Sequence, residues 1–168
     1  MKIAIISDSH DNLINFEKAV SWIKKEKIKT LIHCGDICAP ATLKVALENF
    51  SGKVHLVFGN VDGDHFRITR ASYEDLPQLK VWGELGEIEI GDKKIVFTHF
   101  PEFARGLAAT GKYNLVFYGH THQPWEEKIG KTRLVNPGNL AGLFYKATFA
   151  VYDTKTGKLE LKILENLK

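Results

Sequence analysis

Residues 2–12 read KIAIISDSHDN, an apolar run that is followed at once by Asp8, His10 and Asn12. The run Ile3–Ile6 is short and uninterrupted, which is typical of a strand buried on both faces of a sheet. Polar side chains directly after such a strand lie at the carboxyl edge of the sheet, where α/β proteins bind their ligands. The stretch therefore predicts an α/β fold with a polar site at the end of its first strand.

The same pattern recurs further along the chain. Other short apolar runs also predict buried strands, and helical spacing lies between some of them. The predicted strands are 30–33, 54–58, 95–98 and 115–118. The predicted helices are 13–23 with Asn12 as N-cap, a second that opens at Pro40, and a third over 103–109. Alternating strands and helices in the first half predict parallel pairing there.

The second half instead predicts antiparallel hairpins, because pairs of strand-like runs are separated by short turns that contain glycine. The pairs are 85–90 with 94–97, 126–129 with 132–135, and 147–152 with 159–164. βαβ units followed by hairpins predict an α/β protein in which two mixed β-sheets pack as a sandwich flanked by helices. We expect a single domain over residues 1–168, since this length suits one core.

Composition excludes several classes of protein. The net charge of +3 is too small to predict binding of long nucleic acids. There are two cysteines, fewer than a disulfide-stapled secreted domain carries. No apolar segment approaches the roughly 20 residues of a membrane span, and Ile3–Ile6 is too short for a signal peptide. We therefore expect a cytoplasmic protein without membrane contact.

Several residues that follow predicted strands carry donors for metal ions. Taken singly, Gly35-Asp36 and Gly59-Asn60 could be plain turns, and a lone histidine is more often buried and hydrogen-bonded than a ligand. Two histidines at alternate positions of an extended segment are more specific, because they point the same way. Together the donors favour Mn, Fe, Zn or Co, and one carboxylate could bridge two ions. The residues are Asp8, His10, Asp36, Asn60, His99, His120 and His122.

In this order and spacing, the set resembles the calcineurin-like metallophosphoesterase superfamily, and most closely its small YfcE/MJ0936-type phosphodiesterase branch. The resemblance covers nearly the whole chain and implies a β-sandwich flanked by helices. It implies two divalent metal ions, with manganese expected first and Ni, Fe, Zn or Co as alternatives. Asp36 would bridge the two ions. The first ion would take Asp8, His10 and His122, and the second Asn60, His99 and His120.

The resemblance also implies roles in the reaction. We expect Asp36, Asn60 and His120 to act in catalysis. Asn12 and Asn136 would help to bind the substrate, although the segment 136–138 could also be a simple turn.

The sequence departs from the family pattern after Asn60. Many superfamily enzymes carry a histidine there that assists the leaving group, whereas this chain has Val61 followed by Asp62. Relatives in the small branch often lack this histidine too. Valine cannot donate a proton, so we expect a preference for substrates with good leaving groups. His99 is also followed by Phe100-Pro101 where many relatives have Gly-His, so one pocket wall differs.

The function predicted from these residues is a phosphodiesterase in which a metal-bridging hydroxide attacks the phosphorus of a small phosphoester, with nucleotides among the candidates. The alternatives are a phosphomonoesterase, a nucleotide pyrophosphatase and a non-catalytic scaffold, because a eukaryotic retromer subunit of this fold is used as a scaffold. A homodimer is left open. His33, Cys34 and Cys38 could suggest a separate zinc site, but core packing or a free thiol is the favoured interpretation.

Overall fold

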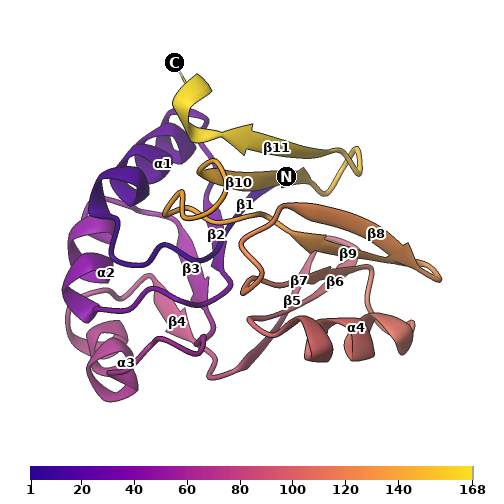
Figure 1. Ribbon diagram of the computed structural model, residues 1–168, viewed down its shortest axis with the longest axis horizontal. Coiled ribbons are helices and arrows are strands. Elements are labelled where there is room, and N and C mark those ends of the chain that lie inside the picture. The colour runs from indigo at the N-terminus through magenta and orange to yellow at the C-terminus, as the bar shows by residue number, and fades with distance from the viewer. Residues whose placement is uncertain (168) are drawn as a thin grey trace.

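The computed structural model describes residues 1–167, which form two packed β-sheets with helices on their outer faces (Figure 1). The strands are β1 Lys2–Ile6, β2 Thr30–His33, β3 Lys53–Leu56, β4 Leu79–Val81, β5 Leu85–Ile90, β6 Lys93–Thr98, β7 Leu115–Phe117, β8 Trp125–Ile129, β9 Thr132–Asn136, β10 Thr148–Asp153 and β11 Leu159–Ile163. The helices are α1 Leu13–Lys25, α2 Pro40–Leu47, α3 His65–Glu74 and α4 Pro101–Ala109, with a 3-10 turn η1 at Leu164–Asn166.

Both sheets are mixed, as predicted. One has the order β11-β10-β1-β2-β3-β4, and the other has the order β5-β6-β7-β9-β8. Strands β1 to β4 are parallel to one another, as are β6, β7 and β9. The three predicted hairpins, β5–β6, β8–β9 and β10–β11, are all antiparallel pairs. The parallel strands bring their carboxyl ends, and the loops that follow, to one edge of each sheet.

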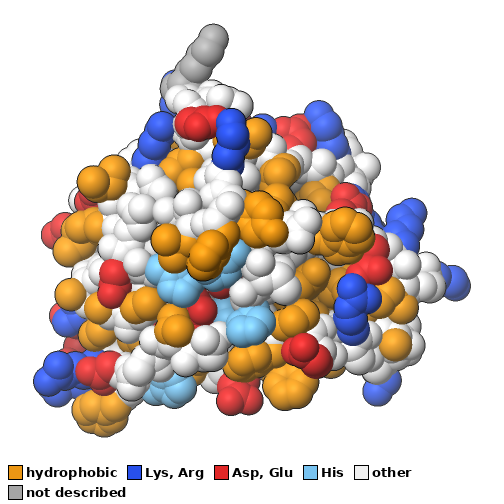
Figure 2. Space-filling view, in the orientation of Figure 1, with side chains coloured by type: hydrophobic (Ala, Val, Ile, Leu, Met, Phe, Trp, Pro, Cys, Tyr) orange, Lys and Arg blue, Asp and Glu red, His pale blue; other side chains and the backbone are white. Residues whose placement is uncertain are grey.

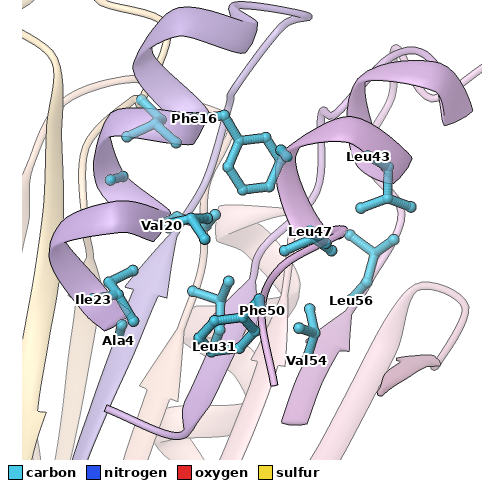
Figure 3. Close-up of a cluster of buried hydrophobic side chains, with 14 of the residues drawn as sticks. Ala4, Phe16, Val20, Ile23, Leu31, Leu43, Leu47, Phe50, Val54 and Leu56 are labelled. Carbon is cyan, nitrogen blue, oxygen red and sulfur yellow. The ribbon is translucent and has the colours of Figure 1, made fainter. Parts of the chain in front are cut away.

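Buried side chains fill three layers of core. The largest lies between the first sheet and helices α1, α2 and α3, where Phe16, Leu31 and Leu43 are fully buried (Figure 3). A second layer joins the two sheets and includes Ile5 and Phe97. The third lies under α4. Because the second layer holds the sheets together, it also fixes the loops at their edges relative to one another.

The predicted helices form for the expected reasons. Asn12 caps α1 by accepting a hydrogen bond from the amide of Asn15, at 3.1 Å. Pro40 opens α2, where its missing N–H has no cost. The third predicted helix, α4, begins two residues early at Pro101.

Helix α3 and strand β4 were not predicted from the sequence. Helix α3 buries only Ile68 and Ala71 and leaves the rest of its surface polar or exposed, so few apolar residues mark it in the sequence. Strand β4 is too short to carry a pattern of its own. Within residues 1–167, no helix combines the length and the apolar character that crossing a bilayer requires.

Candidate metal centre

The structure brings all seven predicted ligands together in the loops that follow five parallel strands. Asp8 and His10 follow β1, Asp36 follows β2 and Asn60 follows β3. From the second sheet, His99 follows β6, and His120 and His122 follow β7. Figure 2 shows histidine side chains gathered near the middle of one face, with hydrophobic side chains around them. The site therefore spans the edges of both sheets.

A first group of donors consists of Asp8, His10, Asp36 and His122. One ligand atom from each lies within 4.8 Å of the others. The Nε2 atoms of His10 and His122 are 3.1 Å apart. His122 Nε2 is 3.3 Å from Asp8 Oδ1, and His10 Nε2 is 3.7 Å from Asp36 Oδ2. Two imidazole nitrogens and two carboxylates that converge in this way suit a transition-metal ion.

A second group consists of Asn60, His99 and His120. Asn60 Oδ1 is 2.8 Å from His120 Nδ1 and 3.0 Å from His99 Nε2. The two histidine nitrogens are 3.2 Å apart. Asp36 Oδ2 is 3.4 Å from His99 Nε2, so the same carboxylate oxygen faces both groups. Asp36 therefore lies where a ligand shared by two ions would be required.

The hydrogen bonding of His99 fits a metal ligand. Its Nδ1 is 2.8 Å from the carbonyl oxygen of Cys34. A carbonyl can only accept, so Nδ1 carries a proton, and Nε2, which faces Asp36 at 3.4 Å, is the ring nitrogen that can bind a metal once it is deprotonated. Metal-ligating histidines characteristically donate their other N–H in this way, which fixes the tautomer and the ring orientation.

Burial and charge perturb the pKa values of the buried ligands in a consistent sense. Burial opposes ionisation of Asp36, but hydrogen bonding and charge from His99 outweigh it and lower the pKa of the carboxyl. Burial also opposes charging of His99, yet Asp36 and Asp8 raise its pKa above the usual value. For His122, the hydrogen bond with Asp8 is the main cause of a raised pKa. In both histidines the carboxylates raise the pKa, and a metal cation would neutralise the same negative charge in place of the protons.

Five of the seven predicted ligands adopt a backbone conformation that residues with side chains normally avoid. Their φ angles lie between 41° and 70°, in the left-handed region. Each such residue costs about 1–2 kcal/mol relative to ordinary backbone. Strain of this kind persists where the surrounding structure enforces it and is common at functional sites. The five are Asp8, His10, Asp36, His120 and His122.

Asp62, which the sequence analysis treated only as a neighbour of Val61, holds the loop that carries Asp36. Its carboxylate is 4% exposed and accepts hydrogen bonds from four backbone amides at 2.7–2.9 Å. The donors belong to Asp36, Ile37, Cys38 and Gly59. The signal in the sequence was an aspartate near two glycine turns, but the pattern does not say which amides it accepts from.

The imidazole of His33 connects the loop after β1 to the loop after β2. Its Nδ1 accepts from the amide of Gly35 at 3.2 Å, and its Nε2 lies 3.0 Å from Ser9 Oγ. Burial lowers its pKa to about 4, so it is neutral. Cys34 packs between the sheets, as the core-packing interpretation predicted, while Cys38 Sγ lies 3.7 Å from His10 Nδ1.

The side chains of the two residues predicted to bind substrate already form hydrogen bonds within the protein. Asn12 caps α1 and donates to the carbonyl of Ala141 at 3.0 Å. Asn136 is 2% exposed and donates to Gly119 and Thr121. Both hold loops of the site in the structure, and contact with substrate stays a prediction for each.

The chain is similar in sequence and fold to several known proteins. Residues 1–157 match the calcineurin-like phosphoesterase superfamily domain. Phosphodiesterase MJ0936 of Methanocaldococcus jannaschii is 31% identical over 168 residues, covering 98% of this chain and 100% of that protein. Phosphodiesterase YfcE of Escherichia coli is 26% identical over 160 residues, covering 84% of this chain and 80% of that protein. A solved structure of a novel archaeal phosphodiesterase, 29% identical, superposes with a TM-score of 0.89 over 97% of this chain and 99% of its own.

Proposed function

Since the chain belongs to the calcineurin-like phosphoesterase superfamily, we propose that it is a metal-dependent phosphodiesterase with a dinuclear centre. The observation that carries the proposal is the pair of donor groups that meet at Asp36, whose Oδ2 faces His10 on one side and His99 on the other. One ion would be held by Asp8, His10, Asp36 and His122. The other would be held by Asp36, Asn60, His99 and His120.

The donor residues differ in burial, and we assign them different roles: some hold the metal site in place and others face the substrate. Asp8, Asp36 and His99 are buried, so they position the site, whereas Asn60 and His120 are exposed and face an incoming substrate. Two divalent ions, when bound, supply a hydroxide nucleophile from water and neutralise charge on the phosphoryl oxygens. The nitrogen and oxygen donors suit manganese, with Ni, Fe, Zn and Co as alternatives.

Neither cysteine is suited to act as the nucleophile. Cys34 is fully buried, which raises the pKa of its thiol well above the usual value. Burial and the nearby Asp11 raise the pKa of Cys38 to about 11. Neither is a thiolate near neutral pH, and the thiolate is the reactive form. This supports attack by water rather than by the protein.

The relatives support a diester rather than a monoester as the substrate. Two of the matched proteins carry the name phosphodiesterase, and this chain is 31% and 26% identical to them. We therefore place phosphomonoesters and nucleotide pyrophosphates second. A pure scaffold is disfavoured, because it has no need of converging donors held by strained backbone.

Metal analysis and activity on an aryl phosphodiester test the proposal together. The chelated protein should be inactive and regain activity with Mn or Ni, and turnover should exceed that on the matching monoester. Activity should also rise with pH as the histidine ligands lose protons, because imidazole must be neutral to bind a metal. A protein that takes up no metal and hydrolyses none of these esters would instead be a scaffold.

Two further predictions from the sequence accompany this function, a single domain and a cytoplasmic location. The two cysteines are unpaired in the structure. A homodimer stays open.

A further inference from the structure

Phe144 is the most exposed large apolar side chain in the described residues, with 91% of its surface accessible. It lies in the loop between β9 and β10, with its ring centroid 5.6 Å from that of His122. Its φ is +65°, a conformation that bulky residues seldom adopt. Exposure and strain together are unfavourable for the folded chain, so this ring calls for a functional explanation.

The loop that carries Phe144 is anchored in the segment just before Phe144. The amides of Leu140 and Ala141 donate to the carbonyls of Ser7 and Asp8, at 2.9 and 3.0 Å. Asn139 accepts from the amide of Leu143 at 2.7 Å. The same Asn139 side chain donates to the carbonyl of His122, at 3.1 Å. These bonds hold the backbone before Phe144 against the loops of Asp8 and His122, so its ring lies next to the first donor group.

A second aromatic surface borders the other donor group. The ring of Phe100 lies 5.2 Å from that of His99 and 5.9 Å from that of His120. Phe103, which is 52% exposed, continues this surface 5.7 Å from Phe100. Apolar side chains border the histidines on the face drawn in Figure 2. Each donor group thus has aromatic rings beside it.

We propose that Phe144 is a stacking platform for a planar ring of the substrate, so that the preferred substrate is a phosphodiester carrying an aromatic base, as in a nucleotide ester. This deepens the proposed function and rests on it. Stacking on an aromatic side chain tolerates any base, because every base has a π-face. A ring on Phe144 lies beside His122, which places the attached phosphate at the donor groups.

The rings at the site favour a substrate over a protein partner. A docking surface can lie anywhere on the molecule, whereas Phe144 and Phe100 each contact a ligand histidine. Stacking of one base is worth about 5- to 150-fold in affinity. The expected effect is therefore large enough to measure in kcat/KM.

The test uses two 4-nitrophenyl phosphodiesters that differ only in a base: the thymidine 5′ ester and the corresponding abasic deoxyribose ester. The metal-loaded full chain should favour the thymidine ester by about 5- to 150-fold in kcat/KM. Phe144→Ala should bring this ratio close to one, because it should lower kcat/KM of the thymidine ester more than that of the abasic ester. Phe144→Trp should preserve the ratio, because it keeps a π-face.

Two controls separate stacking from structural damage. Phe144→Gly should behave like Phe144→Ala while accepting the positive φ without strain. Tyr73→Ala removes an equally exposed aromatic ring on α3 and should leave the ratio unchanged. If the wild type hydrolyses both esters equally, or Phe144→Ala keeps the ratio, the platform is overturned while the phosphodiesterase stands. If the metal-loaded wild type hydrolyses neither ester, the proposed function fails and takes the platform with it.

Discussion

The two ends of the β-sheets solve the same problem, reversing the chain, in opposite ways. The three hairpins turn at the end away from the site, and glycine takes the positive φ there, at Gly91, Gly130 and Gly157. At the site end, Asp8, Asp36 and His120 are among the residues that take it instead. In the hairpin turns glycine adopts positive φ without strain. In the site loops residues with side chains adopt it at a cost in free energy, and their donor atoms point inward.

The difference shows that the strained site loops depend on additional hydrogen bonds from buried side chains. The site loops are held by contacts that the hairpins lack, such as the four amides on Asp62 and the two loops joined through His33. A Cβ added at Gly130 meets nothing within 4 Å, while one added at Gly59 comes 2.1 Å from Asp36 Oδ1. Changes at the site end should therefore alter metal binding, and changes at the hairpin end should alter stability alone.

The largest effect is expected for Asp36→Asn. The substitution replaces the carboxylate oxygen that faces both donor groups, so both ions should be weakened at once. Removing a residue that merely supports a ligand typically costs about 10- to 100-fold, so loss of a shared ligand should cost more than about 100-fold in kcat/KM. Metal content should also fall below that of Asn60→Ala. A variant that kept two metals and normal turnover would remove Asp36 from its bridging position.

Gly59→Ala and Gly130→Ala make the comparison between the two ends direct. At Gly59 the new methyl group displaces Asp36, so we expect overpacking of about 1–3 kcal/mol and a loss of metal affinity of about 10- to 100-fold. At Gly130 the methyl group has space, and only the positive φ of 59° costs, at about 1–2 kcal/mol. Denaturant unfolding and metal titration measure the two effects. Equal metal affinity in both variants contradicts the proposed division.

His33→Gln and His55→Gln sharpen the comparison through pH, because burial lowers the pKa of both histidines to about 4. The folded state favours the neutral ring, so the stability each contributes is present above about pH 6.5 and is lost as the pH falls toward 4. For His33, the slope is at most about 1.4 kcal/mol per pH unit.

Both variants should therefore lose less stability on acidification than the wild type. Only His33→Gln should also weaken metal binding, by about tenfold, because His33 supports Ser9 and Gly35 in two ligand loops. His55 instead contacts Trp82, through a hydrogen bond of 3.2 Å. Weakened metal binding in the His55 variant would show that acid stability, rather than loop support, sets the affinity.

The smallest effect is expected for Val61→His. Val61 is 41% exposed, and its amide donates to Asp36 Oδ1 at 3.1 Å, an interaction that the substitution keeps. A well-placed general acid raises the rate about 10²–10⁴-fold. A histidine introduced here without further optimisation should raise the turnover of alkyl diesters roughly tenfold and that of aryl diesters little. A leaving-group series in both proteins measures this. If the wild type shows no dependence on leaving-group pKa, another acid is present or chemistry is not limiting.

Much of the fold could be read from apolar periodicity and turn residues. Continuous runs such as Ile3–Ile6 marked buried strands, Asn12 and Pro40 marked helix starts, and glycine marked the hairpins. Helix α3 was not predicted because it buries few residues, and strand β4 was not predicted because it is short. The seven candidate ligands were predicted from residue types at strand ends, and the structure brings their side chains together.

The support of the site could not be predicted in the same way. Asp62 and His33 act through backbone amides of distant loops, and such partners have no signature in the sequence. The requirement at Gly59 is also different from the predicted one: it is space beside Asp36 rather than a sharp turn. Phe144 carries no motif, and its importance follows only from its exposure beside His122.

The central claim is that two ions meet at Asp36. Diffraction from Mn-loaded crystals at the manganese absorption edge, with metal analysis of the same protein, tests it most directly. The account predicts two anomalous peaks, one among Asp8, His10 and His122 and one among Asn60, His99 and His120, with Asp36 contacting both. A single peak within the first group at saturating manganese, in protein of full phosphodiesterase activity, would contradict it.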